Sequence, residues 1–587
     1  MNGWAGNLLR VNLSDGSIDK EKLDKEILHD TIGGMGTATR YLFDELKGKI
    51  EPLSEENKVI IFAGPFAGTP IASSGRFCMV TTSPLTNYFL QSHCGGHFGP
   101  EMKYSELDGI IIEGRADDPV YLLIEDDHYE LKTADKLWGR GVKATTSTLE
   151  RDNDPESKIL AIGPAGERQI PISNVKSDVY RSLGRGGTGA VFGSKNLKAI
   201  VARGNGKIDV SDPEYVKDHI LRAKESTYTN AKGFVDFGTT NTGGVVHHAG
   251  GLPTRNFSRG KFETIDNISG TNYVKSIWKG RRACFGCPIG CSHFSAVGGI
   301  RTEGPEYETI FALGSNILND DPETLVEINE MCNDLGIDTM SLGVTLSWLM
   351  EASERGIIKG EYSWGCGKEI LALIRNIVGL EGIGKDLSKG VKKASEIHGG
   401  TDYAIHVKGM ELPGYDPRIC QGMALAYATS NRGACHLRAP IYVKELFQKT
   451  MVPETMEGKV GPTVHTEDLM SLIDCLIVCR FASRTLMDES FGGMSEMLRA
   501  VTGASLSPDV LEGSMKRIWT MQRLYNIKQG MSHEEDTLPE RFFSEELSGH
   551  RIDRELFNAN MQEYYRLRDC DEKGVPTKAS LRSLGII

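Results

Sequence analysis

No run of 18 apolar residues occurs in the 587-residue sequence, so we expect no membrane-spanning helix. The first residues, Met1-Asn-Gly-Trp4, lack the basic and apolar regions of a signal peptide, which favours a cytoplasmic protein. Positive charge is in short supply, because 67 Lys and Arg stand against 79 Asp and Glu and leave a net charge of −12. This charge argues against nucleic acid or an anionic membrane as a partner.

Glycine, by contrast, is abundant, with 67 residues where an average composition would supply about 40. Short runs include Gly95-Gly96 and Gly184-Arg185-Gly186-Gly187-Thr-Gly189. Such turns expose backbone N–H groups, and a neighbouring arginine such as Arg76 or Arg185 can grip a phosphate group. Ordinary turns with solvated arginines are the alternative. The spacing Gly184-x-Gly186-x-x-Gly189 matches a dinucleotide fingerprint, but the absence of a surrounding strand–helix–strand unit argues against that function.

The pattern along the chain divides into three regions. Residues 1–205 contain short apolar segments separated by Gly and Pro, which predict a β-rich domain with one helix near 25–46. The predicted strands are an opening hairpin that starts with 8–13, followed by 59–62, 77–82, 109–113, 120–125, 159–162 and 197–201. Residues 206–405 contain helix starts such as Asp212-Pro213 and helical periodicity, for example over 385–397. Residues 406–587 end in predicted helices near 466–484, 508–527 and 554–568. We therefore predict an α+β protein with a β-rich base domain followed by two mainly helical domains.

The densest chemical signal is the segment Cys284-x-x-Cys287-x-x-x-Cys291. Three thiols at this spacing, separated by Gly and Pro, suit a tight loop around one soft metal centre. A [4Fe–4S] cluster, a structural zinc and a chance grouping are the three interpretations, and both metal centres usually require a fourth ligand. Disulfides are a poor explanation for twelve cysteines in a large chain without a secretory signal.

An ordered set of further motifs extends over more than 400 residues. It comprises Arg10-Val-Asn-Leu, Ala63-Gly-Pro65, Gly186-Gly-x-Gly-Ala-Val, Gly193-Ser-Lys-Asn-Leu-Lys-Ala, Thr302-Glu-Gly-Pro-Glu-Tyr-Glu308, Glu411-Leu-Pro-x-Tyr-Asp-Pro417 and Asn431-Arg-Gly-x-Cys-His436. Together with the cysteine segment, this set resembles the aldehyde:ferredoxin oxidoreductase family. The resemblance implies a tungsten (or molybdenum) bis-pyranopterin site and a [4Fe–4S] cluster at the junction of the three domains.

The resemblance also supplies candidate ligands. The family pattern D-x-x-G-L-C matches Asp474-Cys-Leu-Ile-Val-Cys479, which makes Cys479 the fourth cluster ligand and leaves Cys475 as its local competitor. The related pattern D-x-x-G-L-D appears as Asn333-Asp-Leu-Gly-Ile-Asp338, so Asn333, Asp338 and Asp474 are expected at the pterin edges. Asp334 is a neighbour that could compensate for the amide at 333.

Two further departures of this sequence from the family pattern concern bound ions. The family commonly has asparagine where this chain has His93, and that asparagine helps hold a Mg²⁺ between the pterin phosphates. Imidazole is a poor ligand for so hard an ion, so His93 is expected to bond a phosphate, with Mg²⁺ still expected. The Glu-x-x-His motif of the family's interface iron is replaced by Glu327-x-x-Glu330, which weakens the case for a homodimer or hetero-oligomer.

The expected catalytic pair is Glu308 and His436, which align with the family's active-site glutamate and histidine. An oxygen nucleophile must attack the aldehyde carbon, so a carboxylate of raised pKa can act as general base and a histidine can polarise the carbonyl. Taken alone, Glu308 could be a helix-start residue and His436 a core histidine. The positive segment Lys279-Gly-Arg281-Arg282 either meets an acidic ferredoxin or forms a solvated turn.

The resemblance therefore implies an oxidoreductase that interconverts aldehydes and carboxylates and passes electrons to a ferredoxin or an iron–sulfur subunit. One alternative keeps the scaffold and acts as the catalytic subunit of an aromatic acyl-CoA reductase complex. An alternative from another class is a zinc-stapled binding protein without redox chemistry. The sequence does not name the aldehyde.

Overall fold

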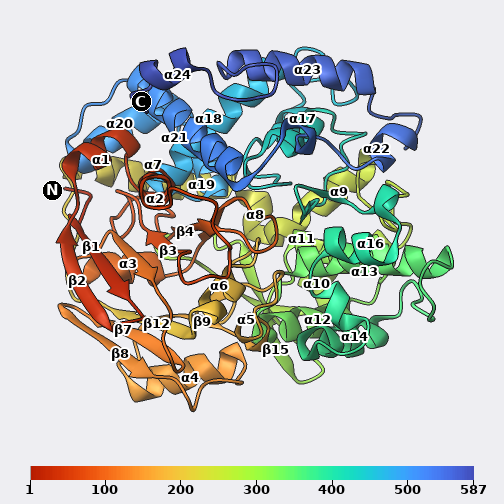
Figure 1. Cartoon of the computed structure of the whole chain (residues 1–587), viewed down its shortest axis with the longest axis horizontal. Coiled ribbons are helices and arrows are strands. Elements are labelled where there is room, and N and C mark those ends of the chain that lie inside the picture. The colour runs from red at the N-terminus through yellow and green to blue at the C-terminus, as the bar shows by residue number, and fades with distance from the viewer. Residues whose placement is uncertain (1) are drawn as a thin grey trace.

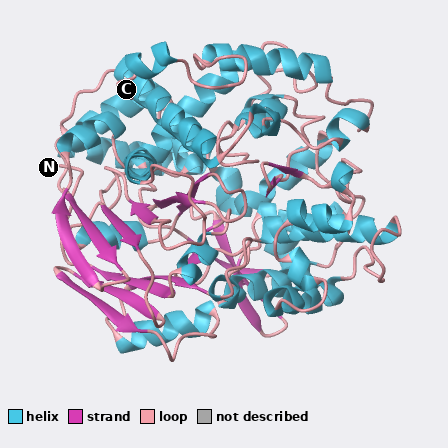
Figure 2. Ribbon diagram, viewed as in Figure 1, coloured by secondary structure: helices cyan, strands magenta, loops and turns pink. Residues whose placement is uncertain are grey.

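Two six-stranded sheets build the N-terminal third of the computed structural model, which describes residues 2–587 (Figures 1 and 2). The first sheet has the order β2-β1-β6-β3-β4-β5, with β1 and β6 parallel and the other neighbours antiparallel. Its strands are β1 (Asn7–Asn12), β2 (Ser17–Lys22), β3 (Val59–Phe62), β4 (Phe77–Thr82), β5 (Phe89–Cys94) and β6 (Gly109–Glu113). The central strands are buried on both faces, which explains their continuous apolar sequences.

The second sheet has the order β11-β10-β9-β12-β7-β8, with β12 and β7 parallel. Its strands are β7 (Val120–Glu125), β8 (His128–Thr133), β9 (Lys158–Ile162), β10 (Val175–Ser177), β11 (Arg181–Leu183) and β12 (Leu197–Arg203). Helices α3 (Phe98–Tyr104), α4 (Val142–Asp152), α5 (Pro164–Glu167) and α6 (Thr188–Ser194) connect the strands. The β-rich character predicted for residues 1–205 is therefore confirmed, although β5, β8, β10 and β11 were not among the predicted strands.

The middle part of the chain is mostly helical but contains a third sheet that the sequence pattern does not predict. Strands β13 (Trp278–Arg282), β14 (Ser292–Val297) and β15 (Ile300–Glu303) pair in that order, all antiparallel. The loop that joins β13 to β14 carries Cys284, Cys287 and Cys291, so the three thiols lie at the turn of a β-hairpin. The hairpin strands are short and polar, which hides them from a hydrophobic pattern.

The helices of the remaining chain enclose the sheets from above and from the side in Figure 1. In the middle part they are α7 (Pro213–Thr229), α8 (Lys232–Phe237), α9 (Asn241–His248), α10 (Gly270–Ser276), α11 (Tyr307–Leu313), α12 (Pro322–Leu335), α13 (Thr339–Glu354), α14 (Gly367–Gly379), α15 (Gly384–Leu387) and α16 (Val391–His398). In the C-terminal part they are α17 (Gly422–Thr429), the π-helix η5 (Val443–Phe447), α18 (Val460–Leu476), α19 (Arg480–Leu486), α20 (Phe491–Thr502), α21 (Pro508–Gln529), α22 (Arg541–Ser544), α23 (Arg554–Leu567) and α24 (Lys578–Ser583).

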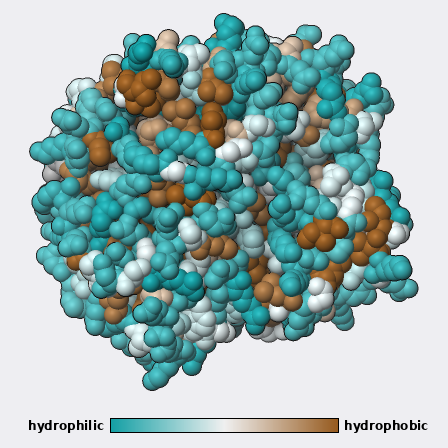
Figure 3. All heavy atoms as spheres, viewed as in Figure 1, coloured by the Kyte–Doolittle hydropathy of each residue, from teal (hydrophilic) through white to brown (hydrophobic). Residues whose placement is uncertain are grey.

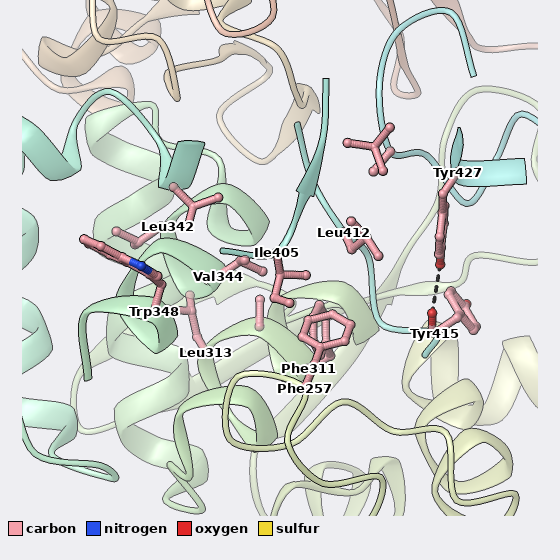
Figure 4. Packing of buried hydrophobic residues seen from close by; sticks show 14 of the residues in the cluster. Phe257, Phe311, Leu313, Leu342, Val344, Trp348, Ile405, Leu412, Tyr415 and Tyr427 are labelled. Carbon is pink, nitrogen blue, oxygen red and sulfur yellow. Dashed lines mark hydrogen bonds between the residues drawn. The ribbon is translucent and has the colours of Figure 1, made fainter. Parts of the chain in front are cut away.

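Two large hydrophobic cores hold these layers together. One packs the first sheet against α2 (Gly34–Glu45), α18, α20 and α21, so the C-terminal part is anchored to the N-terminal part. The other fills the helical half, and Figure 4 shows its side chains, with Trp348 and Phe311 among them and the Tyr427 hydroxyl donating to the Tyr415 carbonyl over 3.0 Å. The α+β fold class is confirmed.

Three predicted helices are interrupted, each at a defined backbone turn. The helix expected over 25–46 divides into α1 (Lys25–Thr31) and α2, because Ile32 and Gly33 have positive φ values of 71° and 145°. The helix expected over 466–484 divides at Ile477, whose left-handed backbone ends α18 and lets Cys479 begin α19. Gly390 interrupts the third, between α15 and α16.

The Ile477 turn has a counterpart. Gly336 ends α12 in the same left-handed conformation, and Asp338 then caps α13. The two related motifs thus share one local structure, a helix end followed two residues later by a side chain that opens the next helix. Both side chains, of Asp338 and Cys479, are thereby aimed into one junction.

The visible face in Figure 3 is mostly hydrophilic, with separate apolar patches. Within residues 2–587 no helix combines the length and apolar character that crossing a bilayer requires.

Gly64 allows the end of α18 to approach the first sheet, because a Cβ there would lie 2.5 Å from the Leu476 carbonyl oxygen. We expect Gly64→Ala to cost about 1–3 kcal/mol of stability, as overpacking does, and to lower the melting temperature in calorimetry. Gly48→Ala is the matched control, because a Cβ at Gly48 meets nothing within 4 Å and the change should stay within about 0.5 kcal/mol. Equal melting temperatures for the two variants would contradict this account.

Candidate functional site

A cavity of about 410 Å³ lies where the N-terminal, middle and C-terminal parts of the chain meet. Most of the predicted site residues line it: Arg76, His93, Gly95, Arg185, Cys284, Cys291, Glu308, Asn333, Asp338, His436 and Cys479. Cys287, Gly96, Gly186, Gly187 and Asp474 were also predicted, and they are not among its lining residues. Residues that lie up to 400 positions apart in sequence therefore converge on one space.

Three cysteine thiols line this cavity and a fourth packs beside them. Cys287, Cys291 and Cys479 pack against the same small apolar cluster, as do Phe234 and Phe481. Cys284 borders the same end, because a Cβ on Gly95 would lie 2.8 Å from its sulfur. Burial raises the pKa of the Cys287 and Cys291 thiols, and the neighbouring thiols Cys479 and Cys284 add to that rise. Deprotonation of these buried thiols therefore requires a cation that compensates the negative charge of the thiolates.

Cys475, the local competitor of Cys479, lies elsewhere. Its sulfur is buried in the core between the first sheet and α18, 3.9 Å from the Met515 sulfur. Although four residues apart would place the two cysteines on one helical face, Ile477 ends the helix between them. The thiol set is therefore Cys284, Cys287, Cys291 and Cys479.

Four thiols are the number of protein ligands that both a structural zinc and a [4Fe–4S] cluster usually take. The thiolates of an iron–sulfur cluster bind different iron atoms, whereas those of a zinc site bind one metal ion. This set of side chains alone therefore fits either centre.

Arginines and a histidine surround the Asp474 carboxylate behind the cavity. Its Oδ2 pairs with Arg438, lies 2.8 Å from Arg480 Nη2 and lies 3.4 Å from His93 Nε2. Burial alone would raise the pKa of Asp474, but Arg438 and Arg480 hold it well below its ordinary value of 3.8. One carboxylate thus faces several cations, and Arg76 and Arg432 add further positive charge nearby.

Several donors in this group have no acceptor. His93 Nε2, Arg480 Nη1 and Arg432 Nε are buried and make no hydrogen bond. A buried donor without a partner costs about 1–3 kcal/mol, more when it is charged, so a structure tolerates several only where a ligand completes them. The missing partner must be anionic and rich in acceptor atoms, which fits pterin phosphates.

Arg185 lines the cavity, and its guanidinium donates hydrogen bonds to protein groups. Its Nε donates to Asp338 Oδ2 over 3.1 Å and its Nη2 donates to the Glu411 carbonyl over 2.8 Å. Asp338 also accepts from the Met340 amide and the Ser341 hydroxyl. In this structure Arg185 ties the N-terminal part to α13, and its role as a phosphate ligand stays a prediction.

The glycines of the same loop pack against protein as well. Gly186 and Gly187 have φ values of 85° and 84°, and a Cβ at either would lie 2.4 Å from Leu90 or Pro84. Gly96 accepts from the Phe285 amide through its carbonyl, which joins the cysteine loop to the end of β5. In this structure these three glycines shape the turns around the cavity without lining it.

Asn333 meets a lysine that the sequence pattern did not indicate. Its Oδ1 accepts from Lys176 Nζ over 2.6 Å, and its Nδ2 donates to Thr302. Burial lowers the pKa of Lys176 to about 8. Asp334 does not compensate for the amide, because its carboxylate accepts from the Lys143 amide at the start of α4.

Glu308 and His436 lie next to each other in the lining of the cavity. Glu308 Oε1 lies 3.5 Å from His436 Nε2, while Oε2 accepts from the Gly414 amide over 2.9 Å. Burial raises the pKa of Glu308 to about 8 and lowers the pKa of His436 to about 3, with Arg185 the next contributor to the histidine shift. At neutral pH both side chains are therefore mainly uncharged.

Aromatic rings complete the wall beside this pair. The Tyr415 and Tyr442 rings stack with centroids 3.8 Å apart, and Tyr415 lies 5.6 Å from the His436 ring. The Tyr307 hydroxyl donates to the Gly414 carbonyl over 2.5 Å. The Oε1 atom of the Glu308 carboxyl beside these rings is buried.

Sequence reasoning missed Lys176, Arg438 and Arg480. Arg438 follows His436 by two residues and Arg480 directly follows Cys479, so proximity to a predicted residue was the available signal.

Two family models match this chain. A family model described as the aldehyde ferredoxin oxidoreductase N-terminal domain matches residues 8–204, and one for domains 2 and 3 of that enzyme matches residues 214–586. The tungsten-containing aldehyde ferredoxin oxidoreductase of Pyrococcus abyssi is 37% identical across 100% of this chain and 99% of its own length. The WOR-like subunit of the aliphatic sulfonate oxidoreductase of Pyrococcus furiosus is 30% identical across 100% and 97%.

A solved structure of similar fold is the active-site complex of benzoyl coenzyme A reductase with 1,5-dienoyl-CoA. The TM-score is 0.87 at 23% identity, over 100% of this chain and 97% of the other. At that identity the likeness concerns the fold. The family models and the full-length relatives go further, and by them the chain belongs to the aldehyde ferredoxin oxidoreductase family.

Proposed function

We propose that this enzyme interconverts aldehydes and carboxylates at a tungsten bis-pyranopterin centre and passes electrons through a [4Fe–4S] cluster to a ferredoxin-like partner. The observation that carries the proposal is the convergence of Glu308 and His436 with three of the four thiols on one cavity, with Cys287 packed beside Cys291 and Cys479. Aldehyde oxidation consumes one water and releases two electrons and two protons, so the site needs a proton acceptor and an electron exit. Full-length relatives that are named as tungsten-containing enzymes support the same function.

The residues present fit the cofactors that this function requires. The unpartnered donors of His93, Arg432 and Arg480 would hold the pterin phosphates, with Arg76 beside them. Asn333 and Asp338 border the cavity where the pterin edges would lie. When bound, the tungsten pterin supplies two-electron redox chemistry and the cluster relays single electrons. A Mg²⁺ between the phosphates remains a prediction, since His93 is a poor ligand for it.

Glu308 would accept the proton of the attacking water. Its pKa of about 8 makes it a far stronger base than an ordinary carboxylate when it ionises. His436 stays neutral, so one of its ring nitrogens can donate a hydrogen bond to the substrate carbonyl while the other accepts. The two groups lie 3.5 Å apart, close enough for both to act on one carbonyl group.

Electrons would leave at the exposed face of the cysteine hairpin. Lys279, Arg281 and Arg282 are exposed on β13, and Arg282 is followed after one residue by the ligand Cys284. Ala283 and Gly286 are exposed as well, so the cluster edge lies close to the surface there. In a chain of net charge −12, this cationic strand favours an acidic iron–sulfur carrier as the partner.

The alternatives stand differently after the comparisons. Membership in an oxidoreductase family removes the support for a zinc-stapled binding protein. The aromatic acyl-CoA reductase alternative rests on a likeness of fold, and copurification with flavin or further iron–sulfur subunits would favour it.

The thiol assignment predicts a difference between two cysteines four residues apart. Cys479→Ala should lower the iron content below the roughly four atoms of the wild type and abolish the cluster signal in electron paramagnetic resonance. Cys475→Ala should keep both, because its sulfur packs only in the core. Iron loss in Cys475→Ala with retention in Cys479→Ala would reverse the assignment.

Glu308 predicts a pH dependence. Because the base must be ionised and its pKa is about 8, kcat/KM should rise about tenfold per pH unit up to about pH 8 and then level off. Glu308→Gln should reduce kcat about 10²–10⁴-fold and lose this rise, with unchanged iron content and circular dichroism. A rate that falls as pH rises through 8 would assign Glu308 the role of an acid.

The cationic strand predicts partner-specific kinetics. The double variant Lys279→Glu and Arg281→Glu should lower kcat/KM for an acidic ferredoxin about tenfold or more at low ionic strength, because steering is lost. Reduction of a small viologen dye should not fall. Reversal of two distant exposed cations, Arg566→Glu and Lys573→Glu, is the control and should leave both rates unchanged. Equal losses in the two double variants would remove β13 from the interface.

A further inference from the structure

A second hollow lies on the outside of the molecule, next to the mouth of the catalytic cavity. It is a groove of about 890 Å³ between α9 and the chain that follows η5. Most of its wall is apolar and comes from Val245, Leu446, Met451, Val452 and Pro453. Val452 is 64% exposed on this wall.

The groove and the cavity share the same two structural elements. On α9, Thr242 lines the cavity, while Asn241 and Gly244 line the groove. On η5, Phe447 lines the cavity, while Leu446 lines the groove. Neighbouring residues of α9 therefore line the cavity and the groove, and the same holds for neighbouring residues of η5.

Phe447 marks where the cavity opens. Its side chain lines the cavity and is 37% exposed to solvent, so it stands at the mouth. Its ring meets the Tyr442 ring edge-on, with centroids 6.1 Å apart. A molecule whose reactive end reaches Glu308 would therefore leave the cavity beside Phe447 and continue into the groove. The π-helical backbone of η5 is of a kind found often at functional sites.

We propose that this groove binds the aliphatic chain of long-chain aldehydes, with the aldehyde group in the cavity; this rests on the proposed function. Four apolar side chains and the flexible Met451 suit a hydrocarbon chain, which needs contact area and no specific polar partner. Four polar residues of the groove, Asn241, His248, Lys449 and Thr450, are exposed and can turn to solvent, and the fifth, Glu445, is buried in an ion pair with Lys459. The groove sets chain-length specificity, and the cavity sets the chemistry.

Gly244 offers a way to fill the groove without disturbing the fold. It lies in α9, and a Cβ there would meet no atom within 4 Å. Gly513 in α21 is the matched control, since it is also helical, has equally open surroundings and lines neither space. Gly244→Phe and Gly513→Phe thus add the same ring to a helix at two places.

The first measurement is kcat/KM for straight-chain aldehydes from three to ten carbons. For the wild type and Gly513→Phe we expect a rise of about two- to fourfold per methylene once the chain passes Phe447, as burial of each CH₂ predicts. In Gly244→Phe the rise should disappear while propanal is oxidised at the wild-type rate. The same slope in all three proteins would overturn the proposal.

The second measurement does not depend on turnover. Decanoate binding to the three holoenzymes, followed by isothermal titration calorimetry, should weaken about tenfold or more in Gly244→Phe alone. Equal decanoate affinities in all three proteins would overturn the subsite. If decanoate binding were lost in Gly244→Phe but no aldehyde were oxidised by the wild type, the subsite would stand and the proposed reaction would fail.

Discussion

The close packing of the C-terminal end of α18 on the first sheet is the constraint on which the site depends. Gly34 and Gly64 let the backbone of Asp474, Cys475 and Leu476 approach so closely that a Cβ at either glycine would lie 2.5–2.7 Å from their carbonyl oxygens. Since the helix ends there, its last turn fixes the Asp474 carboxylate and, through the turn at Ile477, the Cys479 thiol. The fourth thiol therefore reaches the other three because two glycines are small.

Ile477 shows which of two opposing effects prevails at that turn. A left-handed backbone costs a residue with a Cβ about 1–2 kcal/mol, and a β-branched residue is an unusual occupant. The side chain is only 1% exposed, and full burial of an isoleucine returns about 1.5–3 kcal/mol. Burial therefore offsets the strain, and the turn of the related Gly336 motif is kept without its glycine.

The sequence predicted the parts of this structure that depend on local pattern or on resemblance. The buried strands β3, β4, β6 and β7 were predicted to the residue, because two-sided burial produces continuous apolar runs. The hairpin β13–β14 was missed, because its polar strands are held by hydrogen bonds and by the loop they carry. The protein contacts of Arg185 were missed for a different reason: its acceptors, Asp338 and Glu411, come from distant segments, and no local pattern reports such a contact.

Burial also decides which protons the catalytic pair holds. Burial favours the protonated form of Glu308 and the neutral form of His436, and the arginines nearby make a protonated His436 still less favourable. Both side chains are thus neutral, because Glu308 keeps its proton and His436 loses its own. The cavity therefore carries no unpaired charge at this pair. Glu308 can become a base only when its proton is transferred elsewhere, for which neutral His436, 3.5 Å away, is the nearest acceptor. The low pKa of that acceptor opposes the transfer, so ionisation requires either a pH near 8 or a substrate that stabilises the imidazolium.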